Sequence, residues 1–148
     1  MFGRNLILEY LYIKKRPIEL RKFIKTTIRE YLNENLVIDI TKNTEPAPYL
    51  GSRFGQDVEP NGTYVLQGKI DADGYVNGKA NLKKPLFIDV TDNTLIEYKR
   101  ELASKYKAKR QKLTNKLMEL GYDSIITVKE NGEYGEIILF PNASFMMY

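Results

Sequence analysis

The carboxylate of Glu136 is the side chain whose surroundings in this sequence best suit chemistry. It follows Tyr134 and Gly135 and precedes an apolar run over residues 137 to 140. A carboxylate at the mouth of a strand has a rigid base and an open face toward a ligand, which suits a catalytic acid. The alternative is a solvated charge at a strand end, and position alone favours that alternative.

A β-hairpin is predicted to position Glu136. Residues 124 to 128 are β-branched and apolar enough for a strand, residues 130 to 132 contain the Asn-Gly pair of a tight turn, and residues 137 to 140 form the returning strand. Gly121 is expected to end the helix that precedes this hairpin. Glu136 would then stand where the second strand begins.

The composition restricts the available catalytic groups. The chain has no cysteine and no histidine, which excludes disulfides, thiol nucleophiles, imidazole bases and the common zinc sites. Any catalysis must therefore rest on carboxylates, Tyr, Ser, Thr, Lys or Arg. The 148 residues, 43% of them hydrophobic, predict one domain with a core of its own. No apolar run approaches the ~18 residues of a membrane span, and Glu9 interrupts the short run near the start, so we expect a cytoplasmic protein with no signal peptide and no membrane contact.

The order of the predicted elements indicates an α+β domain with a largely antiparallel sheet. An amphipathic helix is predicted over residues 18 to 32, strands over 36 to 40 and 63 to 66, and a glycine-rich irregular loop over 49 to 62. Residues 81 to 90 supply another strand, and Pro85 marks its start. The apolar run of the 81 to 90 strand favours a central place in the sheet. Strands separated by loops and clustered near the end argue against a doubly wound fold.

A single basic helix is predicted from Leu95 to Leu120. Between Glu97 and Lys116 it carries eight Lys or Arg against two Glu, a net charge of +6, whereas the whole chain carries +4. Such a local positive surface could bind nucleic acid or an acidic protein. A solvated helix face is the alternative, and the one favoured for charge sets of this kind.

Four short segments follow one another in an order that is familiar from a known family. They are GTYV at 62 to 65, PLFIDV at 85 to 90, LMELGYDSII at 117 to 126 and EIILFP at 136 to 141. Together they resemble the ADP-ribosyltransferase superfamily, and in particular its small members from phages and other mobile elements. In that family a G-x-Y segment lies in the nicotinamide pocket, a helix leads into a GYDxI strand, and a carboxylate opens the next strand. The resemblance covers residues 49 to 145.

The resemblance implies transfer of ADP-ribose from NAD to a protein or nucleic-acid acceptor, without a metal, by a toxin-like effector built on split antiparallel sheets. It implies that Glu136 binds the 2′-hydroxyl of the nicotinamide ribose and stabilises an oxocarbenium-like transition state. Tyr64 would stack on the nicotinamide, in a pocket formed with Gly62 and Thr63; a half-buried core tyrosine is its alternative role. Arg53 would pair with the pyrophosphate of NAD.

The sequence departs from the family pattern at two places. One branch of the family has a His-Gly pair on its first strand, and this chain has no histidine; the other has a Ser-Thr-Ser motif, of which only Thr63 has a counterpart. Tyr134 stands where many members carry the side chain that activates the acceptor, which leaves the acceptor open. The alternative function is a non-catalytic module that binds an acidic partner through residues 95 to 120.

Overall fold

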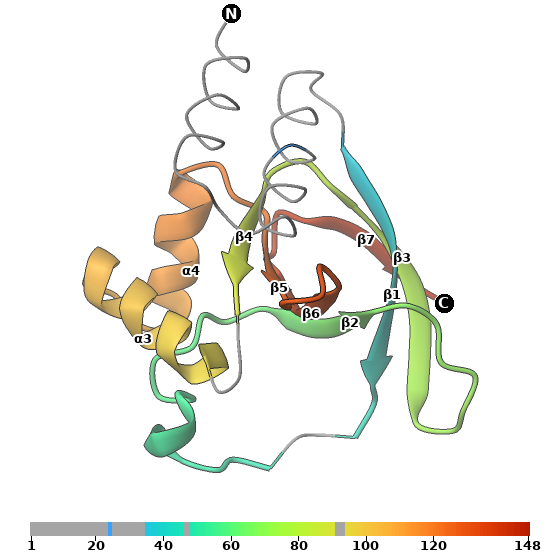
Figure 1. Cartoon of the computed structure of the whole chain (residues 1–148), viewed down its shortest axis with the longest axis horizontal. Helices are drawn as coiled ribbons and strands as arrows, with labels where there is room; N and C mark the ends of the chain where they lie inside the picture. Colours follow the sequence, from blue (N-terminus) through green and yellow to red (C-terminus); the bar gives the residue numbers. More distant parts are fainter. Residues whose placement is uncertain (1–23, 25–34, 46–47, 91–93) are drawn as a thin grey trace, which may run out of the picture.

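In the part of the chain that the structure describes, seven strands form one curled, mixed sheet with two helices against it (Figure 1). The computed structural model describes residues 24, 35–45, 48–90 and 94–148. The predicted α+β class is confirmed. The helix predicted over 18 to 32 lies outside the described residues, apart from Ile24.

The strands run in the order β4-β5-β6-β2-β1-β3-β7. Their bounds are β1 Leu36–Asn43, β2 Thr63–Gln67, β3 Tyr75–Leu82, β4 Pro85–Asp89, β5 Ser124–Val128, β6 Tyr134–Leu139 and β7 Ser144–Met147. The β4–β5 pair is parallel and the other pairs are antiparallel, so the sheet is largely antiparallel as predicted. The expected split into two sheets is absent from the described strands, because β2 pairs with both β6 and β1 and so joins the two halves.

The segment predicted as a strand over 81 to 90 contains the end of β3 and the whole of β4, and β4 begins at Pro85, the predicted strand start. The backbone N–H groups of Lys83 and Lys84, which separate them, donate to the buried carboxylate of Asp123 at 2.7 and 3.3 Å. The same carboxylate accepts the hydroxyl of Ser124 at 3.1 Å. Asp123 therefore fixes the turn between β3 and β4.

β4 lies at one end of the described sheet, so the prediction of a central strand was wrong. Its apolar run has another cause, since both of its faces are covered. Leu86 and Ile88 pack toward the helices, whereas Phe87 packs on the opposite core. A continuous apolar run in a strand indicates that both faces of the strand are buried. It does not indicate whether the strand pairs with one or two neighbouring strands.

The single helix predicted over 95 to 120 is two helices, α3 (Thr94–Tyr106) and α4 (Arg110–Glu119). Lys107 and Arg110 have φ values of 52° and 55°, which interrupt a right-handed helix. At the break, the backbone N–H of Arg110 donates to the carbonyl of Val58 at 3.4 Å. The change of direction thus brings the start of α4 against the loop that precedes β2. Neither helix, nor any other in the described ranges, is long and apolar enough to cross a membrane.

The predicted hairpin is confirmed as β5 and β6, but β6 begins at Tyr134, so Glu136 is its third residue and does not stand at its beginning as predicted. Gly121 ends α4 as predicted. Gly121 has a φ of 94°, its N–H donates to the carbonyl of Met118, and the N–H of Tyr122 donates to the carbonyl of Leu117. These two bonds form a Schellman motif, which requires the left-handed conformation that glycine adopts most readily. The hairpin therefore leaves α4 in a defined direction.

Two apolar cores lie on opposite faces of β5 and β6. The first packs the sheet on α3 and α4 and includes the fully buried Leu113, Ile125 and Phe140. The second contains residues of the curled strands, including the fully buried Ile40 and Ile126. Burial on both faces makes β5 and β6 a rigid support for Glu136.

Candidate functional site

Strand register places Tyr64 and Glu136 on one face of the sheet. Glu136 is the third residue of β6 and lies opposite Leu66 of β2, while Ile138 lies opposite Tyr64. Side chains two residues apart on a strand point to the same face, so these four side chains share it. This is the face that α3 and α4 cover, since Tyr64 and Ile138 pack in that core.

An irregularity in the β5–β6 ladder sets the direction of Glu136. Ile126 lies opposite Ile137, but the register shifts before Val128. Inside this bulge, Thr127 donates its hydroxyl to the backbone carbonyl of Glu136 at 2.7 Å. Bulges bend a strand and redirect its side chains, and they are common beside active sites.

A buried lysine connects Glu136 to a second carboxylate. Lys99 Nζ lies 3.1 Å from Glu136 Oε1 and 3.3 Å from Glu59 Oε2. Its side chain is only 7% exposed, whereas those of Glu59 and Glu136 are 19% and 26% exposed. Tyr98 donates its hydroxyl to the same Oε1 of Glu136 at 3.3 Å. One oxygen of Glu136 thus takes two donors.

Aromatic rings complete the surroundings of the Lys99 ammonium. Its Nζ lies 5.3 Å from the ring centroid of Tyr64 and 5.9 Å from that of Tyr98. Both distances are within the range of cation–π attraction. Burial raises the pKa of both tyrosine hydroxyls far above the ordinary value of about 10, and the nearby carboxylates of Glu59 and Glu136 raise it further. Both hydroxyls therefore stay protonated and act as donors.

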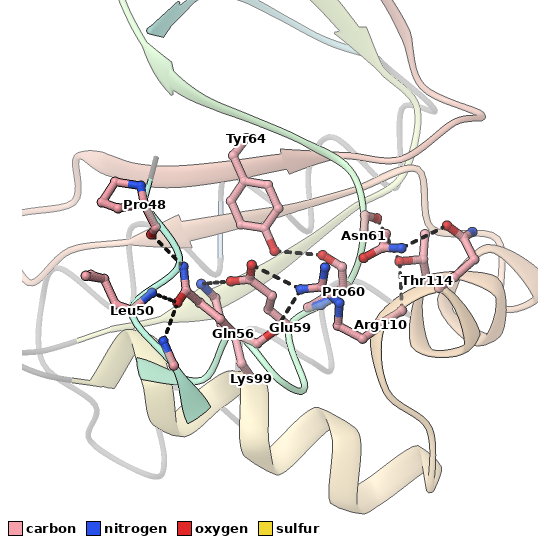
Figure 2. A network of polar contacts seen from close by, with 12 residues as sticks. Pro48, Leu50, Gln56, Glu59, Pro60, Asn61, Tyr64, Lys99, Arg110 and Thr114 are labelled. Carbon is pink, nitrogen blue, oxygen red and sulfur yellow. Dashed lines mark hydrogen bonds and ion pairs between the residues drawn. The ribbon is translucent and has the colours of Figure 1, made fainter. Parts of the chain in front are cut away.

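Polar contacts hold the loop before β2 on the helices, as Figure 2 shows. Gln56 accepts the backbone N–H groups of Leu50 and Gly51 on its side-chain oxygen, at 2.6 and 3.0 Å. Arg110 Nη1 lies 2.7 Å from the carbonyl of Gln56 and 3.3 Å from Glu59 Oε1. Glu59 is thereby fixed between two cations, one from α3 and one from α4.

A cleft of about 930 Å³ opens beside Glu136. Its walls come from β1, β2, β6 and the start of α3, with the apolar side chains Val37, Leu66, Val90 and Leu95 and the charged side chains Asp39, Lys129, Glu133 and Glu136. In the part of the chain that the structure describes, Lys99 and Tyr98 both contact Oε1 of Glu136, and no contact occupies Oε2. Oε2, which has no contact from the described residues, can accept a hydrogen bond from a ligand.

Of the five site residues predicted from the sequence, Glu136 lines this cleft and the other four do not. Tyr64 lies next to Lys99 with its hydroxyl bonded to the carbonyl of Pro60 at 2.7 Å. Thr63 opens β2 and is half-buried. Arg53 is exposed in the short 3-10 helix η1 (Ser52–Phe54), where its guanidinium lies 4.8 Å from the Phe54 ring centroid. Tyr64 and Glu136 thus both contact Lys99. Arg53 has no described contact with any of these three residues.

Gly62 has a packing role at the start of β2. A Cβ at this position would lie 2.7 Å from both Ile138 Cγ2 and the carbonyl oxygen of Leu139. The backbone of β2 can approach β6 this closely only where no side chain intervenes. Gly62 therefore sets the distance between the strands that carry Tyr64 and Glu136.

We expect Gly62→Ala to lower the free energy of unfolding by about 1–3 kcal/mol, because the new methyl group overpacks the contact with β6. Urea unfolding of the variant and the wild type measures this effect. Asn61→Ala is the matched control, since it removes only a 3.4 Å contact with Gln111 and is expected to change stability by less than about 0.5 kcal/mol. Equal stability of Gly62→Ala and wild type would contradict the close packing of these strands.

Sequence reasoning missed Lys99 and Tyr98 as partners of Glu136, and Glu59 and Arg110 as the further members of the same ion-pair cluster. A signal for Lys99 was present: it falls beside Tyr98 on the apolar stripe of α3. A lysine on the buried face of a helix needs a partner. The identity of that partner had no signal, because Glu59 lies 40 residues earlier in the chain.

Neither family models, nor curated proteins, nor solved structures provided a match to this chain. Inference about function therefore rests on the geometry of the site.

Within the described ranges, no group of His, Cys, Asp or Glu side chains is arranged to hold a metal ion.

Proposed function

We propose that this protein is an NAD-dependent ADP-ribosyltransferase that uses Glu136 to transfer ADP-ribose to a macromolecule. The supporting observation is the state of that carboxylate. It is half-buried on a rigid strand, its Oε1 is held by an ammonium and a tyrosine hydroxyl, and it lines a cleft of about 930 Å³. Membership of the ADP-ribosyltransferase-like fold, apart from the split into two sheets that the described strands lack, belongs to the same proposal.

The main contribution of the protein to ADP-ribose transfer is a negative charge placed beside the ribose of NAD. The bond between C1′ of the ribose and the nicotinamide nitrogen breaks, and nicotinamide leaves with the bonding electrons. Positive charge then develops on C1′ and the ring oxygen, which a carboxylate bonded to the 2′-hydroxyl stabilises. The acceptor nucleophile adds to C1′ and loses a proton. Oε2 of Glu136 is the group that supplies this contact.

The charges of the cleft restrict how NAD can lie. The pyrophosphate is repelled by Asp39 and Glu133, and Lys129 is the single cation among the described cleft residues. The nicotinamide ribose would therefore lie at Glu136 and the pyrophosphate toward Lys129 or beyond the cleft. Tyr64 and Arg53 do not line this cleft, so their roles as nicotinamide platform and pyrophosphate ligand, with Gly62 and Thr63 beside them, rest on the family resemblance and require NAD to extend beyond the cleft.

Incubation with NAD tests this function directly. The protein is mixed with a cell lysate and NAD labelled on its adenylate half, and free nicotinamide is measured in parallel. We expect nicotinamide release together with label on a macromolecule, and protease or nuclease digestion shows which acceptor class carries it. A wild-type protein that binds no NAD and releases no nicotinamide contradicts the proposal.

A binding module for an acidic partner is the second candidate function, and exposed lysines favour it. Three of the eight basic residues between 97 and 116 contact carboxylate or carbonyl oxygens of the protein: Lys99 and Arg110 as above, and Arg100 at the carbonyl of Ser52. Lys105 lies 5.2 Å from the ring centroid of Tyr106. The remaining five are exposed on α3, α4 and their connection, and they are Lys105, Lys107, Lys109, Lys112 and Lys116. This lysine surface, and not the whole basic set, is available to a partner.

If the lysine surface binds nucleic acid, affinity is expected to fall with salt, with a slope of roughly −3.5 to −4.5 in log K against log salt for about five phosphate contacts. A titration by fluorescence anisotropy at several salt concentrations measures the slope. Replacing Lys109, Lys112 and Lys116 together by Ala is expected to reduce the slope by about 2 to 3.

The control replaces three exposed lysines of the sheet region, Lys42, Lys69 and Lys79, and keeps the same change in net charge. Equal effects of the two triple variants indicate a general charge effect. No binding, or binding that does not respond to salt, leaves the lysine surface as an ordinary solvated helix face.

A further inference from the structure

Lys99 is a buried charge on the apolar stripe of α3, where a methionine or leucine would need no charged partner. Tyr98 and Leu102 on the same stripe of α3 are buried, and Lys99 is 6% exposed. Taking an ammonium out of water costs several kcal/mol, which only well-placed partners offset. In many proteins, replacing a buried ion pair by apolar side chains of similar volume leaves the stability unchanged or raises it. The position of Lys99 therefore points to a role in the site.

The contacts of Lys99 are distributed over two carboxylates. Its Nζ contacts one oxygen of Glu136 and one of Glu59, at 3.1 and 3.3 Å. The hydroxyl of Tyr98 adds a second donor to the same oxygen of Glu136. Two donors on one oxygen restrict the rotation of the carboxylate, and they leave the lone pairs of Oε2 for a ligand.

The cluster of Glu59, Lys99, Arg110 and Glu136 is electrically balanced, with two positive and two negative groups. Arg110 contacts Glu59 at 3.3 Å, so Glu59 has cations on two sides, and Lys99 is shared. An ammonium that paired with Glu136 alone would cancel more of the negative charge that faces the cleft. Because Lys99 also pairs with Glu59, its ammonium neutralises the carboxylate of Glu136 less completely.

We infer that Lys99 is a positioning residue that orients Glu136, and that Glu59 shares its ammonium so that Glu136 keeps a negative charge toward the cleft. This inference rests on the proposed transferase function. A displacement of a catalytic group by about 1 Å can cost ~10²-fold in rate, so a loss of orientation is measurable. Because Lys99 acts through Glu136, its loss affects turnover more than NAD binding.

The test uses three variants that change the charge of the cluster in different ways. Lys99→Met keeps the length of the side chain and leaves one excess negative charge. Glu59→Gln leaves one excess positive charge. The double variant Glu59→Gln with Lys99→Met returns the cluster to balance but lacks the ammonium. For each, kcat and KM for NAD are measured by nicotinamide release, and the melting temperature by circular dichroism.

We expect Lys99→Met to lower kcat by ~10²-fold, with KM for NAD within about twofold of the wild type, and to lower the melting temperature. Glu59→Gln should lower kcat by about tenfold, because the ammonium then neutralises Glu136 more fully. The double variant should regain most of the lost melting temperature and none of the lost kcat. Stability and turnover would thus separate, which a purely structural lysine does not predict.

Two results overturn the positioning role while the transferase function stands: wild-type kcat in Lys99→Met, or recovery of kcat together with stability in the double variant. Should Lys99→Met fail to fold, the double variant and Glu59→Gln carry the same test. A wild-type protein that releases no nicotinamide overturns the proposed function itself, and the positioning role falls with it.

Discussion

Replacing Glu136 by Gln is expected to keep the fold and NAD binding and to lower the rate of ADP-ribose transfer by ~10² to 10³, about 3 to 4 kcal/mol. Glutamine has nearly the same shape and can still accept the donors of Lys99 and Tyr98 on its side-chain oxygen. It cannot offer a negative charge to the cation that develops at C1′. Nicotinamide release at saturating NAD measures the rate, calorimetry the NAD affinity, and circular dichroism the fold.

Glu133→Gln is the matched control for this prediction. Glu133 lines the same cleft three residues earlier, is exposed, and has no contact with Lys99 among its described interactions. The same change of charge at that position should leave turnover at saturating NAD within about twofold of the wild type, because Glu133 is exposed and its carboxylate is not placed at the reacting atoms. Its effect is expected on NAD affinity, since Glu133 repels the pyrophosphate. If Glu136→Gln turns over as fast as the wild type, the catalytic role of Glu136 is wrong, and a protein that binds no NAD is better described by the binding module.

Unfolding free energy is expected to fall steeply as the pH rises above about 10, because Tyr64 and Tyr98 are buried as neutral phenols. Their pKa values are raised in the folded protein and are about 10 in the unfolded chain. Below pH 10 both states keep these protons, and the stabilisation is fully present. Above pH 10 the unfolded chain releases protons that the folded protein retains, so stability is lost at about 1.4 kcal/mol per pH unit for each tyrosine.

Urea unfolding at pH values from 8 to about 11 measures this loss, and two variants isolate its origin. Tyr98→Phe removes one buried hydroxyl, so its stability should fall with pH less steeply than that of the wild type, by about 1.4 kcal/mol per unit. Tyr148→Phe is the control, since the side chain of Tyr148 is 71% exposed to water and not buried. Parallel slopes for Tyr98→Phe and wild type would show that Tyr98 is not held as a buried phenol.

The elements with strong local patterns were predictable from the sequence. The β5–β6 hairpin followed from β-branched runs on either side of an Asn-Gly turn, and the end of α4 followed from Gly121. The first strand was predicted within β1 from its LVIDI run. In each case the signal and the structure lie within the same few residues, so no distant contact is needed to produce them.

Two strands and a helix break had no such signal. β3 and β7 contain polar or exposed residues, and their pairing depends on neighbours elsewhere in the sheet. The break between α3 and α4 is hidden because Tyr106 and Leu113 are seven residues apart, which keeps the apolar stripe in phase across two turns. At the break, the backbone N–H of Arg110 contacts the carbonyl of Val58, in the loop before β2. The periodicity of the sequence carries no information about this contact.

The candidate site divides in the same way. The sequence by itself determined that Glu136 stands on a strand of a hairpin, since its neighbours carry that pattern. Only the tertiary structure decided that its carboxylate meets Lys99 and Tyr98 and, through Lys99, Glu59. Periodicity reports whether a side chain faces a core along its own element. Which charges become partners depends on where a loop, a helix and a strand meet, and that is settled by the packing of the whole chain.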